Sequence, residues 1–245
     1  MPPHASCHHK TMRVCCCLTA LFLCVPLAAK VPLEPVQIVS TSKAELSSGG
    51  TVRIIGSTGQ LDVEGWDQPE VEVTVIKSTY RGTSSKEKQD GTRDLNRLNV
   101  STDRKSPTEV LIRTSLPGRS ITRPLRGMTS IDLEYHIKVP RDAHLVIRHG
   151  SGDVRLENLT AGIDADSHMG DMVVLLPESG HYAIDAKCRV CGVYSDFAGR
   201  HHTEDLVGEK FTEQASDSGT RVRLRVGMGG IQILKLPNIA TAPRP

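Results

Sequence analysis

Apolar and polar residues alternate most clearly between Leu145 and Leu176, in short runs separated by glycines. In the first run, Val154 and Leu156 alternate with Asp153 and Arg155. A period of two places the apolar side chains on one face of a β-strand and the charged ones on the other. Each run follows a glycine, and the intervals between these glycines are 10 and 8 residues (Gly152, Gly162 and Gly170). Short strands and glycine corners at a near-constant interval predict a chain that coils into stacked rungs.

The same alternation predicts strands in most of the remaining chain. It covers residues 36–63, 71–75, 131–139 before Pro140, 222–226 and 231–233. Three polar stretches interrupt it and are predicted to be loops: residues 81–94, which could open a short helix-like run at 94–98, residues 117–127, and residues 199–219. The pattern therefore predicts an all-β protein with one domain, a β-solenoid over residues 36–236. A two-sheet β-sandwich is the alternative, because it also uses short alternating strands.

Both ends of the chain differ in composition from this region. Residues 1–29 resemble a secretory signal peptide, with Lys10 and Arg13 before an uncharged apolar run and a small residue, Ala29, at the expected cleavage point. Retention of this segment as an uncleaved anchor is the alternative. Residues 30–35 would be a linker, and the proline-rich residues 237–245 a disordered tail. The expected product is exported, to the periplasm, the envelope or the cell exterior, without a stable transmembrane span after cleavage.

Charge and aromatic content narrow the class of partner. The chain has 30 basic and 28 acidic residues, and loss of Lys10 and Arg13 with the signal would leave 28 of each. A balanced charge removes the general electrostatic argument for binding nucleic acid. With three Phe, four Tyr and one Trp in the whole chain, Val, Ile and Leu must fill the core.

Two cysteines, Cys188 and Cys191, lie outside the predicted signal. In an oxidising compartment they form a candidate disulfide, and the alternative is two free thiols without a chemical role. A redox role would need a helix N-terminus to lower the thiol pKa, but the flanking residues are typical of strands. A zinc site would need a second pair of ligands. His201 and His202 are near in sequence, yet they are adjacent to each other in a polar stretch.

Few other residues indicate chemistry. Arg119, Arg123 and Arg126 form a cluster without acids that could bind a phosphate or an acidic glycan, although such a run is more often a solvated loop. Trp66 could stack on a sugar, but covering the end of the early rungs is the more ordinary role. Sequence motifs for nucleophilic, metal-dependent or nucleotide chemistry are absent. Four aspartates are expected on solvated strand faces: Asp153, Asp164, Asp171 and Asp185.

Several motifs together resemble the bacterial putative-adhesin domain of unknown function. They are Gly65-Trp66-Asp67, Ile137–Pro140, Gly150–Val154, Gly170–Met172, Tyr194–Phe197 and Arg225–Ile231. The resemblance covers roughly residues 36–236 and implies an exported or envelope-attached β-solenoid with one domain. It carries no binding residues to transfer. Residues 188–191 depart from it, because the family more often has a small polar turn before the glycine.

The sequence thus favours a non-catalytic envelope or surface protein, an adhesin-like or scaffolding module without a cofactor, acting on an unknown protein or glycan partner. The alternative is a β-helix protein that binds or cleaves polysaccharide. That alternative requires carboxylates and one of the three loop arginines to converge in a cleft near Trp66.

Overall fold

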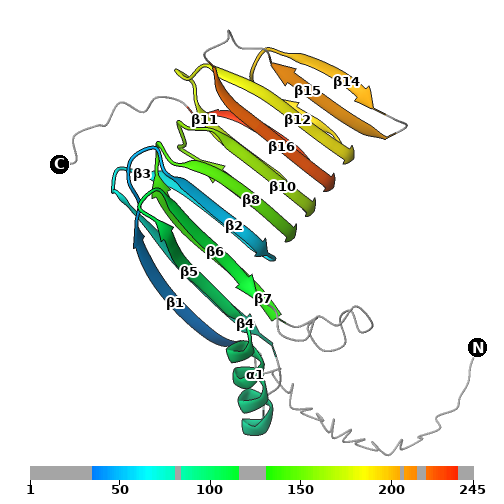
Figure 1. Cartoon of the computed structure of the whole chain (residues 1–245). Helices are drawn as coiled ribbons and strands as arrows, with labels where there is room; N and C mark the ends of the chain where they lie inside the picture. Colours follow the sequence, from blue (N-terminus) through cyan, green and yellow to red (C-terminus); the bar gives the residue numbers. More distant parts are fainter. Residues whose placement is uncertain (1–34, 81–83, 116–130, 205–206, 214–218, 237–245) are drawn as a thin grey trace, which may run out of the picture. The chain divides into compact units, whose positions relative to one another are not determined.

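Two large β-sheets and one helix make up the described part of this computed structural model, residues 35–80, 84–115, 131–204, 207–213 and 219–236 (Figure 1). In spatial order, sheet A contains β1 (Val36–Glu45), β4 (Glu70–Thr79), β7 (Ile131–Pro140), β3 (Gln60–Trp66), β9 (Val154–Glu157), β11 (Met172–Pro177), β17 (Ile231–Leu236) and β13 (Val193–Ser195). Sheet B contains β14 (Arg200–Glu204), β15 (Gly208–Glu213), β12 (Tyr182–Val190), β16 (Thr220–Met228), β10 (Ile163–Met169), β8 (His144–Ser151), β2 (Thr51–Ser57), β6 (Glu109–Ser115) and β5 (Asn99–Ser106). The helix is α1 (Ser85–Arg97). The all-β prediction is confirmed.

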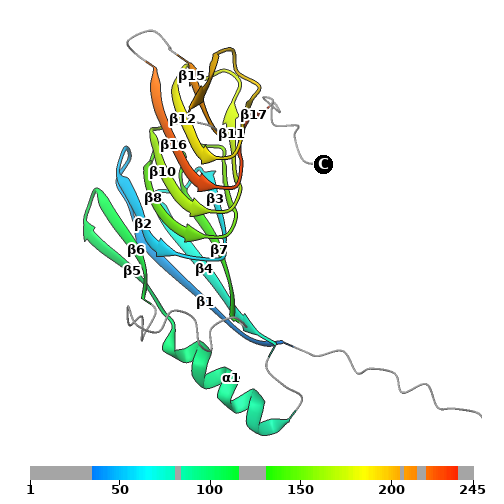
Figure 2. The same ribbon diagram turned by 90° about the vertical axis from the view of Figure 1, so that its right-hand side faces the viewer.

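Pairs of consecutive strands connect the two sheets, and we term each pair an arch: a strand of sheet B followed by a strand of sheet A. Neighbouring arches pair in parallel through both of their strands, as in β8 with β10 and β9 with β11. Figure 2 shows these arches edge on. Among the described strands, the order of the arches is β6–β7, β2–β3, β8–β9, β10–β11, β16–β17, β12–β13.

The order of the arches departs from the order of the sequence. The last arch in the chain, β16–β17, lies between β10–β11 and β12–β13.

The repeat itself also differs from the expected one. One arch takes two strands, so the corresponding residues Val154 and Met172 lie 18 residues apart and pair across sheet A. The expected intervals of 10 and 8 residues are the two halves of one arch.

Antiparallel strands extend the stack of arches at both ends. β4 and β1 continue sheet A beyond β7, β5 continues sheet B beyond β6, and β15 and β14 continue sheet B beyond β12. Two predicted loops were therefore wrong. Residues 199–219 contain β14 and β15, and most of residues 81–94 belong to α1. The helix begins with a capping box between Ser84 and Glu87 and buries Leu95, so local capping compensates for its nearly uniform polarity.

A single hydrophobic core takes side chains from both sheets. Val154, Leu156, Met172 and Val174 were predicted to point inward, and each is at most 1% exposed. Aliphatic side chains fill most of this core because parallel arches bring equivalent inward positions into register. For example, Ile163 pairs with Val222, and Ala165 with Leu224.

A ladder of glycines forms the corners between the two sheets. Gly152 and Gly170 have φ values of +110° and +119°, which L-residues with a Cβ rarely adopt. The nearest obstacle to a Cβ on each glycine is the carbonyl of the glycine one arch away, from Gly59 through Gly152 to Gly170. Gly162, the third expected corner, is not among the described glycines with positive φ and lies between β9 and β10 instead.

Two exposed aspartates lie at these corners, each directly before a strand of sheet A. Asp153 Oδ1 accepts a hydrogen bond of 3.0 Å from the backbone N–H of Asp171. The Leu61 and Val154 amides donate to the Asp153 and Asp171 carbonyls at 2.9 and 2.8 Å. The recurrent Gly-Asp pairs therefore join each arch to the next through the backbone. Asp153 and Asp171 are exposed, as expected, but they lie in the corners before β9 and β11 and not on strand faces.

Residues 1–29, residues 30–34 of the linker and the tail at 237–245 lie outside the described residues. No helix in the described part of the chain has the length and apolar character needed to cross a bilayer.

Candidate functional site

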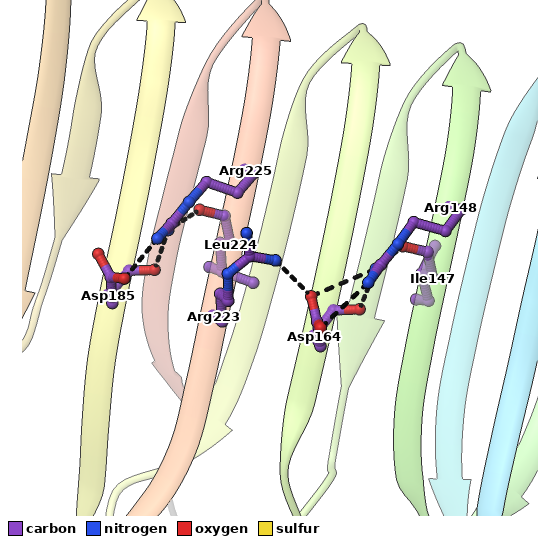
Figure 3. A network of polar contacts seen from close by, with 7 residues as sticks. All are labelled: Ile147, Arg148, Asp164, Asp185, Arg223, Leu224 and Arg225. Atoms are coloured by element: carbon purple, nitrogen blue, oxygen red, sulfur yellow. Dashed lines mark hydrogen bonds and ion pairs between the residues drawn. The ribbon is translucent and has the colours of Figure 1, made fainter.

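The outward face of sheet B carries a ladder of arginines and aspartates (Figure 3). Asp164 on β10 accepts two hydrogen bonds from Arg148 on β8, at 3.2 and 3.1 Å, and one from Arg223 on β16, at 2.9 Å. Arg225, also on β16, pairs with Asp185 on β12. Asp164 and Asp185 do lie opposite the apolar residues, as predicted, but they bind guanidinium groups of neighbouring strands.

The contacts with arginine affect the charge state of Asp164. Burial opposes ionisation of Asp164, but hydrogen bonds from Arg148 and Arg223 outweigh it and lower the pKa of that carboxyl. The Asp164 carboxylate is therefore ionised at neutral pH. Exposed pairs of this kind stabilise a fold only weakly, but paired charges hold long side chains in fixed positions.

Beside this ladder lies a hollow of about 260 Å³ formed by β10, β12 and β16. We term it the basic hollow, because four cationic side chains and one carboxylate are among its lining residues (Lys187, Arg189, Arg223, Arg225 and Asp166). Sequence analysis missed it. The signal was the alternation of Arg221, Arg223 and Arg225 with Val222, Leu224 and Val226, which places three cations on one face of β16.

A second hollow, of about 310 Å³, lies on the outward face of sheet A. Three carboxylates line it, those of Asp62, Glu64 and Glu157, together with His136, Lys138 and Arg155. Asp62 lies 3.5 Å from His136 Nδ1, and Glu157 lies 2.7 Å from Arg155 Nη2. This sheet A hollow therefore alternates positive and negative groups, unlike the basic hollow.

Trp66 lies at the end of β3, half-buried, and its indole N–H donates to the carbonyl of Glu70 at 2.8 Å. The ammonium groups of Lys43 and Lys138 lie 5.9 and 5.4 Å from the ring centroid. Cation–π contacts of this kind already occupy the ring. They favour the structural interpretation of Trp66 over sugar stacking.

Cys188 is fully buried at the end of β12, and Cys191 follows between β12 and β13. Their Cα atoms lie 5.4 Å apart, a separation that a disulfide spans. The flanking residues are strands, as the sequence predicted. The disulfide itself stays a prediction.

His201 and His202 lie on β14, at the edge of sheet B. His201 Nδ1 lies 2.5 Å from Glu209 Oε1, and its ring packs 4.9 Å from that of Phe211. Glu209 also accepts a hydrogen bond from the Val193 amide. In the described part of the chain, no group of three metal-ligating side chains comes together. Arg119, Arg123 and Arg126 lie outside the described residues, between β6 and β7.

Comparison with known proteins finds similarity at the level of fold. No family model and no curated protein matches the chain. The structure is similar to that of a putative cell adhesion protein from Clostridium sporogenes ATCC 15579, with 13% identity, a TM-score of 0.51, and coverage of 81% of this chain and 100% of that one. Lower similarity relates it to putative adhesins from Bacteroides fragilis NCTC 9343 (8% identity, TM-score 0.30, coverage 80% and 97%) and Parabacteroides distasonis ATCC 8503 (9%, 0.22, 80% and 70%).

These neighbours are bacterial proteins whose names describe them as putative adhesins or cell adhesion proteins. At 13% identity the first similarity concerns the fold alone, and the two lower TM-scores add no argument.

Proposed function

We propose that this chain is an exported, non-catalytic envelope or surface protein, an adhesin-like or scaffolding module built on a β-solenoid. Of the fifteen pairs of hydrogen-bonded strands in the described residues, ten are parallel and five are antiparallel. This supports the solenoid over a sandwich of antiparallel sheets. The antiparallel strands extend the stack at its ends. The apolar run at residues 14–27 supports export.

One observation carries the non-catalytic part of the proposal: several carboxylates on the outer faces form ion pairs on successive strands. Asp164 and Asp185 each bind arginine, and Glu157 binds Arg155. An enzyme site needs an acid or base that is available to a substrate in a concave pocket. Broad sheet faces with ordered charges suit recognition of a partner better than turnover.

The sheet A hollow supports the alternative, a polysaccharide-cleaving enzyme, because it brings three carboxylates together close to Lys138, which itself contacts Trp66. The two functions differ in whether the polymer changes. The purified chain is incubated with a panel of soluble polysaccharides, and binding and new reducing ends are measured together. Binding without new reducing ends supports the proposal. Turnover that is lost in Glu64→Gln or Glu157→Gln, but not in Glu109→Gln on sheet B, would establish the enzyme instead.

Attachment to the cell surface is tested in the source cell. Cells that lack the chain, cells that express it and cells that express it without residues 1–29 are compared for surface labelling and adhesion. We expect labelling and adhesion only with the full chain. Equal adhesion in all three would contradict an adhesin-like role.

A further inference from the structure

We propose that the basic hollow of sheet B, with the row of cations that crosses it, binds an acidic polysaccharide through its carboxylate or sulfate groups. This inference rests on the proposed function, because it names the class of partner for an exported binding module. It places the contact on sheet B, away from the sheet A hollow, and uses none of the arginines at 117–127.

A transverse row of cations runs through the hollow. Parallel and antiparallel register aligns five positions on neighbouring strands, and four of them are basic: Lys210, Lys187, Arg225, Asp166 and Arg148. Neighbouring strands lie about 4.8 Å apart, so this row extends over roughly 19 Å. A single inorganic anion would use one or two of these positions. A linear polymer with repeated negative charges can use the whole row.

The local charge is strongly positive. The ladder, the hollow and the transverse row together contain six cations and three carboxylates (Arg148, Lys187, Arg189, Lys210, Arg223 and Arg225 against Asp164, Asp166 and Asp185). Their excess of positive charge is larger than the +2 of the complete chain at pH 7. The surplus is thus concentrated on this face of sheet B, where it attracts an anionic partner.

The guanidinium groups are positioned before any ligand arrives. Arg225 donates to the Asp185 and Leu224 carbonyls at 2.7 and 2.8 Å and to the Asp185 carboxylate. Three of its five N–H donors are engaged, so two remain for a ligand. Arg223 uses one donor, on Asp164. Positioned donors lose little conformational entropy on binding, which favours affinity.

Arg189 is the most available of these groups. It is exposed at the end of β12 and makes no hydrogen bond or ion pair with the described part of the chain. Its neighbour across the sheet is Gly227, which has no side chain that could pair with it. A planar guanidinium at such a position can bind a carboxylate or sulfate with two parallel hydrogen bonds.

The lining of the hollow distinguishes a polysaccharide from a nucleic acid. Single-stranded nucleic acids bind grooves that combine cations with aromatic rings on which bases stack. Besides its cations, the hollow is lined by Asp166, Ser167, His168, Val226 and Gly227. The lining includes no Phe, Tyr or Trp. The hollow therefore offers charge and hydrogen bonds but no large stacking surface.

The test measures binding of the full chain to polygalacturonic acid and chondroitin sulfate by biolayer interferometry. Lys187→Gln/Arg189→Gln removes two cations from the hollow. The matched control, Lys105→Gln/Arg113→Gln, removes one lysine and one arginine from β5 and β6 of the same sheet. Because charge-assisted contacts are lost only in the first variant, we expect roughly tenfold weaker binding there and less than about twofold in the control. Circular dichroism checks that both variants fold.

Other probes separate this inference from its competitors. Dextran, a neutral polymer, should not bind, and the affinity for polygalacturonic acid should fall with salt. Equal binding by the two double variants, or binding of oligo(dT) or phosphatidylglycerol vesicles as tightly as the acidic polymers, would overturn the inference. If no acidic polymer binds but surface adhesion persists, the inference fails and the proposed function stands. If reducing ends appear in the bound polymer, the non-catalytic proposal fails while the binding site remains.

Discussion

Replacing Gly170 by alanine tests the close packing of the corner ladder. Gly170 has a φ of +119°, and a Cβ there would approach the carbonyl oxygen of Gly152 far more closely than the 3.0 Å that real Cβ atoms keep. Two backbone hydrogen bonds join the two arches beside this corner: the Gly152 amide donates to the Met169 carbonyl at 2.9 Å, and the Val154 amide donates to the Asp171 carbonyl at 2.8 Å. To relieve the collision, the two arches must separate at this corner and both hydrogen bonds must lengthen.

The expected loss in the free energy of unfolding follows from these contacts. A left-handed backbone costs an alanine about 1–2 kcal/mol, and each weakened hydrogen bond adds about 1 kcal/mol. Loss of glycine flexibility in the unfolded chain returns about 0.4–1 kcal/mol. We therefore expect Gly170→Ala to lower the free energy of unfolding by about 3 kcal/mol, a large fraction of the ~5–15 kcal/mol typical of a domain.

Two control variants separate backbone strain from collision. Gly49 has a φ of +69°, but nothing lies within 4 Å of its Cβ position, so Gly49→Ala should lose only about 1 kcal/mol. Gly150 lacks a positive φ, and the nearest atom to its Cβ position is the Ser57 oxygen at 3.4 Å, so Gly150→Ala should be close to neutral. Urea unfolding followed by circular dichroism measures all three. Equal losses for Gly170→Ala and Gly49→Ala would refute the close approach of the corners.

Three further predictions concern acid stability, the cysteines and export. His149 hydrogen-bonds Ser57 at 2.8 Å, its Nε2 has no partner among the described residues, and burial lowers its pKa. As the pH falls, the unfolded chain therefore binds a proton at this histidine before the folded chain does. The free energy of unfolding should then decrease as the pH drops below about 6.5. His149→Asn should flatten this part of the pH profile measured by urea unfolding, and an unchanged slope would exclude His149 as its source. Replacing Cys188 and Cys191 by serine should leave the fold intact and cost about 2 kcal/mol or less, because the closed loop is short; release of bound zinc on replacement would indicate a metal site instead. N-terminal sequencing of secreted or periplasmic protein should begin near Lys30, whereas cytosolic protein that retains Met1 or Met12 would contradict export.

The sequence determined which side of each strand faces the core. Alternation between Val154 and Val174 predicted both the strands and their buried faces, because inward positions repeat every second residue whatever strand lies alongside. The Gly-Asp pairs likewise predicted corners, since φ values above +100° leave few residues other than glycine. The all-β class and the strand character around Cys188 and Cys191 needed no knowledge of the neighbouring strands.

Pairing between strands was decided only by the tertiary structure. Residues 220–236 insert between two arches that precede them in the sequence, and alternation does not specify which parallel neighbour a strand takes. β14 and β15 went unrecognised because these two strands, which end sheet B, bury few side chains and therefore have a weak period of two. The basic hollow was not predicted either, because the sequence does not specify which strands lie side by side. Arg189 and Arg225 lie 36 residues apart in the sequence, and they share a surface because parallel pairing places β12 beside β16.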